Sequence, residues 1–251
     1  MTLPLIGLTS KVSEASEPFN EREADVQIGH WYVQHVQRCG GVAVLIPPRE
    51  DMSPNMARRV LSALDGLIIT GGADVSPAYY QEQPHPKSGP FAPERDMLDI
   101  TLLREAQQMD LPVLGVCRGM QVMAAERGGK LCQHIPDVFE GIHDLPGNVY
   151  SQHPVCTVEG TKLDALIGDC CRQVYGKHHQ SVLTHPGYVP AAWSADGVLE
   201  AMEDPTRTFQ IGVQWHPEVA DQSCILRAFV AAAVDYAQGR TDRNVAMEYR
   251  P

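Results

Sequence analysis

The sequence predicts an α/β domain in which a mostly parallel sheet is covered by helices on both faces. Short runs rich in β-branched residues alternate with stretches of helical periodicity, which is the pattern of such a sheet. Hydrophobic residues make up 43% of the 251 residues, enough to form a large core. No segment has the composition of a linker, so we expect one domain over residues 1–240 and a loose polar tail over 241–251.

The first half of the chain contains four predicted strands, each separated from the next by a helix. The strands are expected at 3–9, 42–46, 67–70 and 112–116, and the helices at 26–39, 55–64, 95–109 and 119–127. The helix over 26–39 has its apolar residues on one side and stops at two glycines, Gly40 and Gly41. Those apolar residues are Ile28, Trp31, Val36 and Cys39.

Beyond residue 129 the pattern becomes mostly β. Strands are expected at 155–158, 188–192, 198–202 and 209–213. An alanine-rich helix over 224–238 closes the domain.

The charge and the cysteines limit the classes of partner and the compartment. Twenty Lys and Arg against 31 Asp and Glu give a net charge of −11, which repels nucleic acid and anionic lipid. No apolar run reaches the length of a membrane span, and seven scattered cysteines do not indicate a disulfide framework. We therefore expect a cytoplasmic protein that binds neither nucleic acid nor membrane, with a homodimer as the default assembly.

Cys117 lies in the segment most informative about chemistry. A buried strand runs through Gly115 to Cys117, and a helix follows from Gly119. This strand–turn–helix arrangement is that of a nucleophile elbow, with a cysteine as the nucleophile. The helix N-terminus supplies positive potential, which favours the thiolate. The alternative is a buried core cysteine with no chemical role.

His216 and Glu218 follow the predicted strand over 209–213 and flank a proline. A cysteine nucleophile requires a base, and the base requires a group that orients it. This segment supplies both kinds of side chain, although by itself it could be a surface turn.

Two further glycines, Gly71 and Gly72, come directly after a buried strand and could turn a backbone N–H toward an oxyanion. An ordinary turn at the end of the strand is the alternative. No Gly-x-Gly-x-x-Gly opens a helix, and no Gly-Lys-Ser/Thr phosphate loop is present, so dinucleotide and phosphate-loop folds are excluded.

Together these motifs resemble the class I glutamine amidotransferase superfamily. The superfamily has the same motifs in the same order over residues 3–238. They are a Gly-Gly loop, a Gly-x-Cys-x-Gly-x-Gln elbow and a Gln-Trp-His-Pro-Glu segment. Within the superfamily, Cys-Arg-Gly-Met-Gln and Gly-Gly-Ala-Asp-Val-Ser-Pro resemble the stand-alone γ-glutamyl hydrolases of the peptidase C26 kind, such as γ-glutamyl-γ-aminobutyrate hydrolase. The fold that this resemblance implies is flavodoxin-like.

The resemblance implies a role for each matching residue. Cys117 matches the nucleophile, His216 the general base and acid, and Glu218 the carboxylate that orients the imidazole. The backbone N–H groups of Gly72 and Arg118 match the oxyanion hole. Gln121 matches a residue near the glutamyl pocket, and no cofactor, metal or ATP is implied.

One segment departs from the family pattern. Over 174–180 the chain has Tyr175 and Gly176 where relatives carry Asn and Ser, followed by His178, His179 and Gln180. We expect these last three residues to bind substrate. The proline-rich loop over 81–93 and the segment over 175–176 are the expected walls of a cavity for the amine, where Gly176 would widen the pocket unless Tyr175 fills the same space. A metal site is the alternative for the two histidines, and we expect none because no carboxylate or cysteine lies at ligand spacing.

Arg95, at the start of the predicted helix over 95–109, belongs to a Glu-Arg-Asp segment that also resembles a family motif. Helix capping explains the two carboxylates of this segment. We expect Arg95 to approach the substrate.

The function that follows is hydrolysis of the γ-glutamyl amide bond of a small γ-glutamyl amine, through a glutamyl thioester. The amine could be γ-aminobutyrate, a polyamine derivative or an aromatic amine. The alternatives are a glutaminase subunit that delivers ammonia to a synthetase, a peptidase acting on γ-glutamyl tails, and a non-catalytic binding protein on the same fold. Arg118 argues against the glutaminase subunit, because synthetase-linked members commonly have Leu after the nucleophile.

Overall fold

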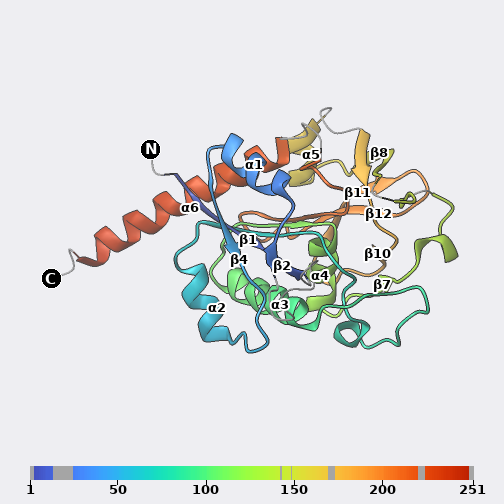
Figure 1. Ribbon diagram of the computed structural model, residues 1–251. Coiled ribbons are helices and arrows are strands. Elements are labelled where there is room, and N and C mark those ends of the chain that lie inside the picture. The colour runs from blue at the N-terminus through green and yellow to red at the C-terminus, as the bar shows by residue number, and fades with distance from the viewer. Residues whose placement is uncertain are drawn as a thin grey trace.

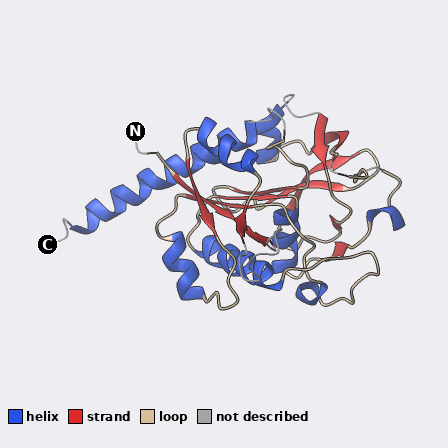
Figure 2. Ribbon diagram, in the orientation of Figure 1, coloured by secondary structure: helices blue, strands red, loops and turns tan. Residues whose placement is uncertain are grey.

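A computed structural model describes residues 3–13, 25–141, 143–147, 149–168, 173–219 and 224–248, with side chains described as far as residue 240. Within this part of the chain, one large sheet runs through the molecule and helices lie on both of its faces (Figures 1 and 2). No helix of the described chain is long and apolar enough to cross a membrane.

The large sheet has the strand order β4-β1-β5-β6-β13-β12-β11-β8-β9, with β10 and β7 attached beside β12. Neighbouring strands from β4 to β13 are parallel, and those from β13 to β9 are antiparallel. Its strands are β1 (Leu5–Thr9), β4 (Val42–Ile46), β5 (Gly66–Ile69), β6 (Val113–Val116), β7 (Leu131–Cys132), β8 (Ser151–Thr157), β9 (Gln173–Gly176), β10 (Ser181–Val182), β11 (Val189–Ser194), β12 (Leu199–Glu203) and β13 (Gln210–Val213). The predicted mostly parallel sheet is confirmed.

The helices divide into two groups, one for each face of the sheet (Figures 1 and 2). One face carries α2 (Pro54–Leu61), α3 (Pro93–Gln108) and α4 (Arg118–Glu126), and the other carries α1 (His30–Arg38), α5 (Lys162–Ile167) and α6 (Cys224–Glu248). Two short 3-10 helices, η1 (Pro77–Tyr80) and η2 (Ile135–Asp137), lie in the loops.

Each face of the sheet has its own hydrophobic core, because successive side chains of a strand point to opposite faces. On β5, Leu67 and Ile69 pack with α2, α3 and α4, whereas Ile68 packs with α1, α5 and α6. All three side chains are fully buried, and each such burial contributes roughly 1.5–3 kcal/mol. The central strands are therefore held in place from both sides.

The ends of the helices follow from local residue choices. The Ser53 hydroxyl accepts the backbone N–H of Met56 at 3.3 Å, and Pro54 begins α2 at a position that needs no N–H donor. Pro93 begins α3 in the same way, with Glu94 and Asp96 in its first turn.

Two expectations differ from the structure near the N-terminus. The helix predicted over 26–39 begins only at His30, because Asp25–Gln27 pairs as β3 with β2 (Lys11–Ser13) in a small separate sheet. The apolar side predicted for this helix is not fully buried: the Trp31 side chain is 52% exposed and lies beside a cavity described below.

At the other end, α6 continues through the segment that we expected to be a loose tail. The helix runs past residue 240 as far as Glu248, and residues 249–251 lie outside the described chain. The division into a domain over 1–240 and a loose tail stays a prediction.

Candidate active site

Three adjacent parallel strands bring the predicted catalytic segments to one edge of the sheet. In the order β5-β6-β13, Gly71 follows the first strand, Cys117 the second and His216 the third. The carboxyl ends of parallel strands share one edge, which is where open α/β sheets place their ligands. The backbone N–H of Cys117 donates to the Val213 carbonyl at 2.7 Å, so the elbow is tied directly to β13.

Cys117 occupies a backbone conformation that non-glycine residues rarely adopt, with φ 52° and ψ −106°. Such a conformation costs roughly 1–3 kcal/mol and persists only where the surroundings impose it. Gly119 is required two residues later, because a Cβ there would overlap the carbonyl oxygen of Ile69. A Cβ at Gly115 would lie 2.5 Å from the Met123 sulfur. Because these two glycines have no side chain, the first residues of α4 can pack close to β5. Cys117 then lies at the turn between β6 and α4.

His216 and Glu218 form a buried pair, with Nδ1 of the imidazole 2.7 Å from Oε1 of the carboxylate. Gly71 packs between this pair and the elbow: a Cβ on Gly71 would lie 3.1 Å from His216 Cε1 and 3.7 Å from Cys117 Cβ. Burial alone would lower the pKa of His216, but the negative charges of Glu218 and of the Cys117 thiolate outweigh burial and hold it well above its ordinary value. The imidazole is therefore poised to carry a proton beside the sulfur.

The backbone N–H groups of Gly72 and Arg118 lie in neighbouring segments. A Cβ on Gly72 would be 3.3 Å from Cδ of Arg118, so the Gly-Gly loop and the start of α4 are in contact. Neither N–H has a hydrogen-bond partner among the residues that the structure describes. Both donors thus remain available for an oxyanion.

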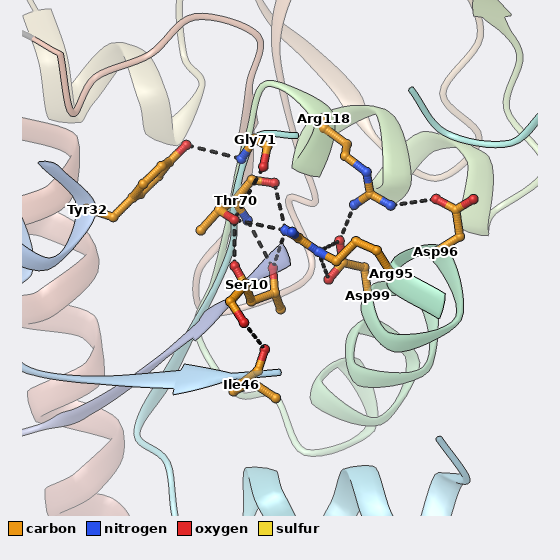
Figure 3. A network of polar contacts seen from close by, with 10 residues as sticks. Ser10, Tyr32, Ile46, Thr70, Gly71, Arg95, Asp96, Asp99 and Arg118 are labelled. Atoms are coloured by element: carbon orange, nitrogen blue, oxygen red, sulfur yellow. Dashed lines mark hydrogen bonds and ion pairs between the residues drawn. The ribbon is translucent and has the colours of Figure 1, made fainter. Parts of the chain in front are cut away.

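Two buried arginines and two buried aspartates fix these segments (Figure 3). The Arg118 guanidinium pairs with Asp96 and Asp99, and Arg95 Nε donates to Asp99 Oδ2 at 2.9 Å. Arg95 Nη2 also donates to the Thr70 hydroxyl at 2.8 Å and to the Thr70 carbonyl at 3.2 Å. The strand end before Gly71 and Gly72 is therefore held by α3, and the charges of the four ionic side chains balance.

A cavity of about 210 Å³ opens beside His216 and Glu218. Its wall includes the predicted residues Gly72 and Arg95, and also several residues that sequence reasoning missed. The missed residues include Lys11 of β2, Tyr32 and Trp31 of α1, and Tyr150, whose ring lies edge-on to the His216 ring at 5.2 Å. No motif marks these residues, because they come from segments distant in sequence from the triad.

Tyr32 connects the Gly-Gly loop to the triad. Its hydroxyl accepts the backbone N–H of Gly71 at 3.1 Å. Burial, and secondly the negative charge of Glu218, raise the pKa of Tyr32 well above its ordinary value, so the phenol stays protonated. The Tyr32 hydroxyl therefore keeps its proton and can donate it to an acceptor near Glu218.

The other residues expected to bind substrate do not line this cavity. Gln121 is buried, and its amide donates to the Gln180 carbonyl and to the Gln214 side chain, both at 3.2 Å. The amide of Gln180 in turn donates to the Gln133 carbonyl at 3.2 Å. These two amides tie the segment over 178–180 to α4 and to neighbouring loops.

His178 and His179 point to different surroundings. The His179 imidazole lies 3.1 Å from Asp74, and His178 is buried with Nδ1 3.0 Å from the Gln180 carbonyl and Nε2 3.7 Å from Glu200. Burial lowers the pKa of His178 to about 4. No carboxylate lies at ligand spacing from these histidines in the sequence, but the fold brings Glu200 of β12 close to His178.

Gly176 was expected to widen the substrate pocket. A Cβ there would instead lie 2.8 Å from the His153 ring and 3.4 Å from His178 Nε2. The glycine makes room for two histidines.

Comparison with known proteins shows the family of this chain. The model of the Peptidase C26 family matches residues 4–218. The chain belongs to the Peptidase C26 family. This C26 protein is 40% identical over 240 residues to the protein Rv2859c of Mycobacterium tuberculosis, covering 93% of the chain and 76% of the relative.

A second relative of the C26 protein carries the name of an activity. Gamma-glutamyl-gamma-aminobutyrate hydrolase PuuD of Escherichia coli K12 is 30% identical over 198 residues, covering 74% of this chain and 76% of the relative. Among solved structures, the glutaminase domain of Trypanosoma brucei CTPS with bound acivicin is similar with a TM-score of 0.62 and 18% identity, covering 93% and 94% of the two chains. The C26 protein thus has the flavodoxin-like fold of class I glutamine amidotransferases and is a glutamine amidotransferase-like hydrolase.

Proposed function

We propose that this C26 protein hydrolyses the γ-glutamyl amide bond of small γ-glutamyl amines, with Cys117 as the nucleophile. The observation that supports this most strongly is the placement of the strained Cys117 turn beside the His216–Glu218 pair, whose atoms are 2.7 Å apart. A strained, nearly buried cysteine next to an oriented imidazole has little use in a binding protein.

The first half-reaction forms a thioester. The Cys117 thiolate attacks the γ-carbonyl carbon, and the carbonyl oxygen becomes an oxyanion that accepts the N–H groups of Gly72 and Arg118. The intermediate collapses as the carbon–nitrogen bond breaks, and the departing amine takes the proton of the His216 imidazolium. Loss of one such N–H donor costs about 2.7–4 kcal/mol of transition-state stabilisation.

The second half-reaction restores the enzyme. Water attacks the thioester carbon while the neutral His216 imidazole takes a proton from it. The carbon–sulfur bond breaks, glutamate leaves, and the thiolate and imidazolium are regenerated. Glu218 remains ionised throughout and keeps Nδ1 of His216 protonated and aimed.

The cavity next to the triad fits the charges of a γ-glutamyl group. Such a group carries an α-carboxylate, and the cavity wall contains two cationic side chains besides His216, namely Lys11 and Arg95. Arg95 is already paired with Asp99, so Lys11 is the better partner for the substrate carboxylate. The approximately 30% identity to a γ-glutamyl-γ-aminobutyrate hydrolase supports the same substrate class.

Steady-state kinetics of the chain alone, without ATP or a second protein, tests this proposal. We expect kcat/KM for γ-glutamyl-γ-aminobutyrate or γ-glutamylputrescine to exceed that for glutamine by about 10-fold or more, because a pocket for the amine substituent contributes about 1–3 kcal/mol for each methylene. Cys117→Ala should abolish turnover of every substrate, and Cys156→Ala, at an exposed cysteine of β8, should leave it unchanged. A preference for glutamine, or activity only with a partner, would contradict the proposal.

A further inference from the structure

Four side chains that this mechanism does not use gather behind the active site. They are His143 and His178 from loops, His153 of β8 and Glu200 of β12. One donor atom from each of His143, His153 and Glu200 lies within 4.8 Å of the donor atoms of the other two. Glu200 is fully buried and the His143 side chain is 3% exposed.

The distances from Glu200 to the three histidines are close to the spacing of ligands around one metal ion. Oε1 of Glu200 lies 3.2 Å from His143 Nδ1, 3.1 Å from His153 Nε2 and 3.7 Å from His178 Nε2. Tetrahedral zinc has bonds of about 2.0–2.1 Å to nitrogen and oxygen, which places neighbouring ligand atoms about 3.3 Å apart.

Hydrogen bonds explain only some of these short distances between histidine nitrogens and Glu200. His153 Nε2 has hydrogen-bond geometry to Glu200. His178 Nε2 is a buried nitrogen without a hydrogen-bond partner within the described chain, and His143 Nδ1 lies 3.2 Å from the same oxygen. Ring nitrogens that lie close to a carboxylate oxygen without being hydrogen-bonded to it are arranged as ligands of one central ion would be.

The remaining ring nitrogens of two histidines are held from outside the cluster. His143 Nε2 lies 3.0 Å from Oδ2 of Asp196, and His178 Nδ1 lies 3.0 Å from the Gln180 carbonyl. Such outer partners fix the tautomer and the ring orientation of metal-binding histidines. With a metal ion bound, the inward nitrogen of each ring would give up its proton to the solvent and bind the ion.

We propose that His143, His153 and Glu200 bind a Zn²⁺ ion, and that His178, whose Nε2 lies 3.7 Å from Glu200, moves inward to complete a tetrahedral set of four ligands. Imidazole and carboxylate donors in this geometry favour zinc over the harder cations Mg²⁺ and Ca²⁺. A cavity of about 460 Å³, whose wall includes His143 and His178, gives the ion a route from the surface.

The ion would stabilise the segment that supports the triad. His178 lies at the end of the stretch over 175–178, in which the Tyr175 carbonyl accepts the His216 N–H at 2.8 Å and the Lys177 carbonyl contacts the Cys117 sulfur at 4.0 Å. The zinc is thus structural: it holds the backbone behind Cys117 and His216 and does not touch the substrate.

Metal titration of the full chain tests the site. After dialysis against a chelator, the wild-type chain should take up one Zn²⁺, and Co²⁺ in its place should give the intense visible absorption bands of tetrahedral coordination. Zn²⁺ should also raise the melting temperature. A wild-type chain that takes up no Zn²⁺, or a Co²⁺ spectrum without these bands, would overturn the proposal and leave the cluster as a polar core.

Three variants and one matched control locate the ion. Glu200→Gln and His153→Gln should lose the Co²⁺ bands, and Asp196→Asn, outside the ligand set, should weaken Zn²⁺ affinity about 10- to 100-fold. His85→Gln changes a histidine that lies 3.1 Å from Asp137, away from the cluster, and should bind as the wild type does. Wild-type affinity in Asp196→Asn together with unchanged bands in the ligand variants would refute the assignment. If a ligand variant fails to fold, Asp196→Asn and the wild-type spectrum decide.

Discussion

His216 is the residue whose protonation is set most clearly by its neighbours. The imidazole is almost fully buried, which by itself would favour the neutral form, yet Glu218 and the Cys117 thiolate hold its pKa well above the ordinary value. The imidazolium is the form that protonates the departing amine. Acylation should therefore persist until the pH passes this raised pKa.

Removing the charge of Glu218 should move the alkaline limb of the pH profile. Glu218→Gln keeps the size of the side chain but removes one cause of the raised His216 pKa, so the imidazolium is lost at lower pH. We expect the alkaline limb of kcat/KM to shift to lower pH, and kcat/KM at its maximum to fall on the order of 100-fold or more. Some activity should remain above that of Cys117→Ala, because Glu218 only orients the group that exchanges protons.

Glu159→Gln, at an exposed carboxylate, is the matched control and should leave the profile in place. A limb that stays fixed or moves to higher pH in Glu218→Gln would show that Glu218 does not control the charge of His216.

At the scale of elements, the β6–α4 elbow is the feature that the sequence predicts best. Its signal is local: Gly115, Cys117 and Gly119 lie within five consecutive residues, and each glycine avoids a specific overlap in the structure. The helix over 26–39 was predicted less well, since its first residues pair instead with Lys11–Ser13. Pairing between distant segments overrides helical periodicity where only a few residues are involved.

The tight start of α4 predicts a large effect of a single methyl group. Gly119→Ala would force a Cβ into the Ile69 carbonyl, so β5 and α4 would have to move apart; we expect a loss of about 1–3 kcal/mol of unfolding free energy. Gly239→Ala in α6, where the added Cβ meets nothing within 4 Å, should instead raise it by roughly 0.5–1 kcal/mol. Urea denaturation of both variants measures the difference, and equal stabilities would show that the elbow is not tightly packed.

At the scale of the whole molecule, the sheet order explains which parts of the site could be predicted. Cys117, His216 and Gly72 each follow a buried strand, so strand order alone brings them to one edge. The cluster of three histidines and Glu200 could not be found in this way. Its members come from four separate segments, which meet through the pairing of β8 with β9 and β11 and of β11 with β12, and through a backbone hydrogen bond between His178 and His143.

The same limit applies to the substrate-binding residues. Gln121 and Gln180 were expected at the glutamyl pocket from their places in motifs, whereas their side chains join buried segments to one another. The cavity wall also includes Lys11, Tyr32 and Tyr150, which no spacing rule connects to the triad. The catalytic chemistry is encoded locally, and the shape of the pocket depends on long-range packing.

The most direct test of a cysteine-dependent γ-glutamyl hydrolase is to trap the covalent intermediate. The chain is mixed with a γ-glutamyl amine, quenched in acid during turnover, digested and analysed by mass spectrometry. We predict that the peptide containing Cys117 gains the mass of one glutamyl group in thioester linkage, and that the gain disappears in Cys117→Ala. A glutamyl group on any other residue, or full turnover with no modification of Cys117, would contradict the assignment of Cys117 as the nucleophile.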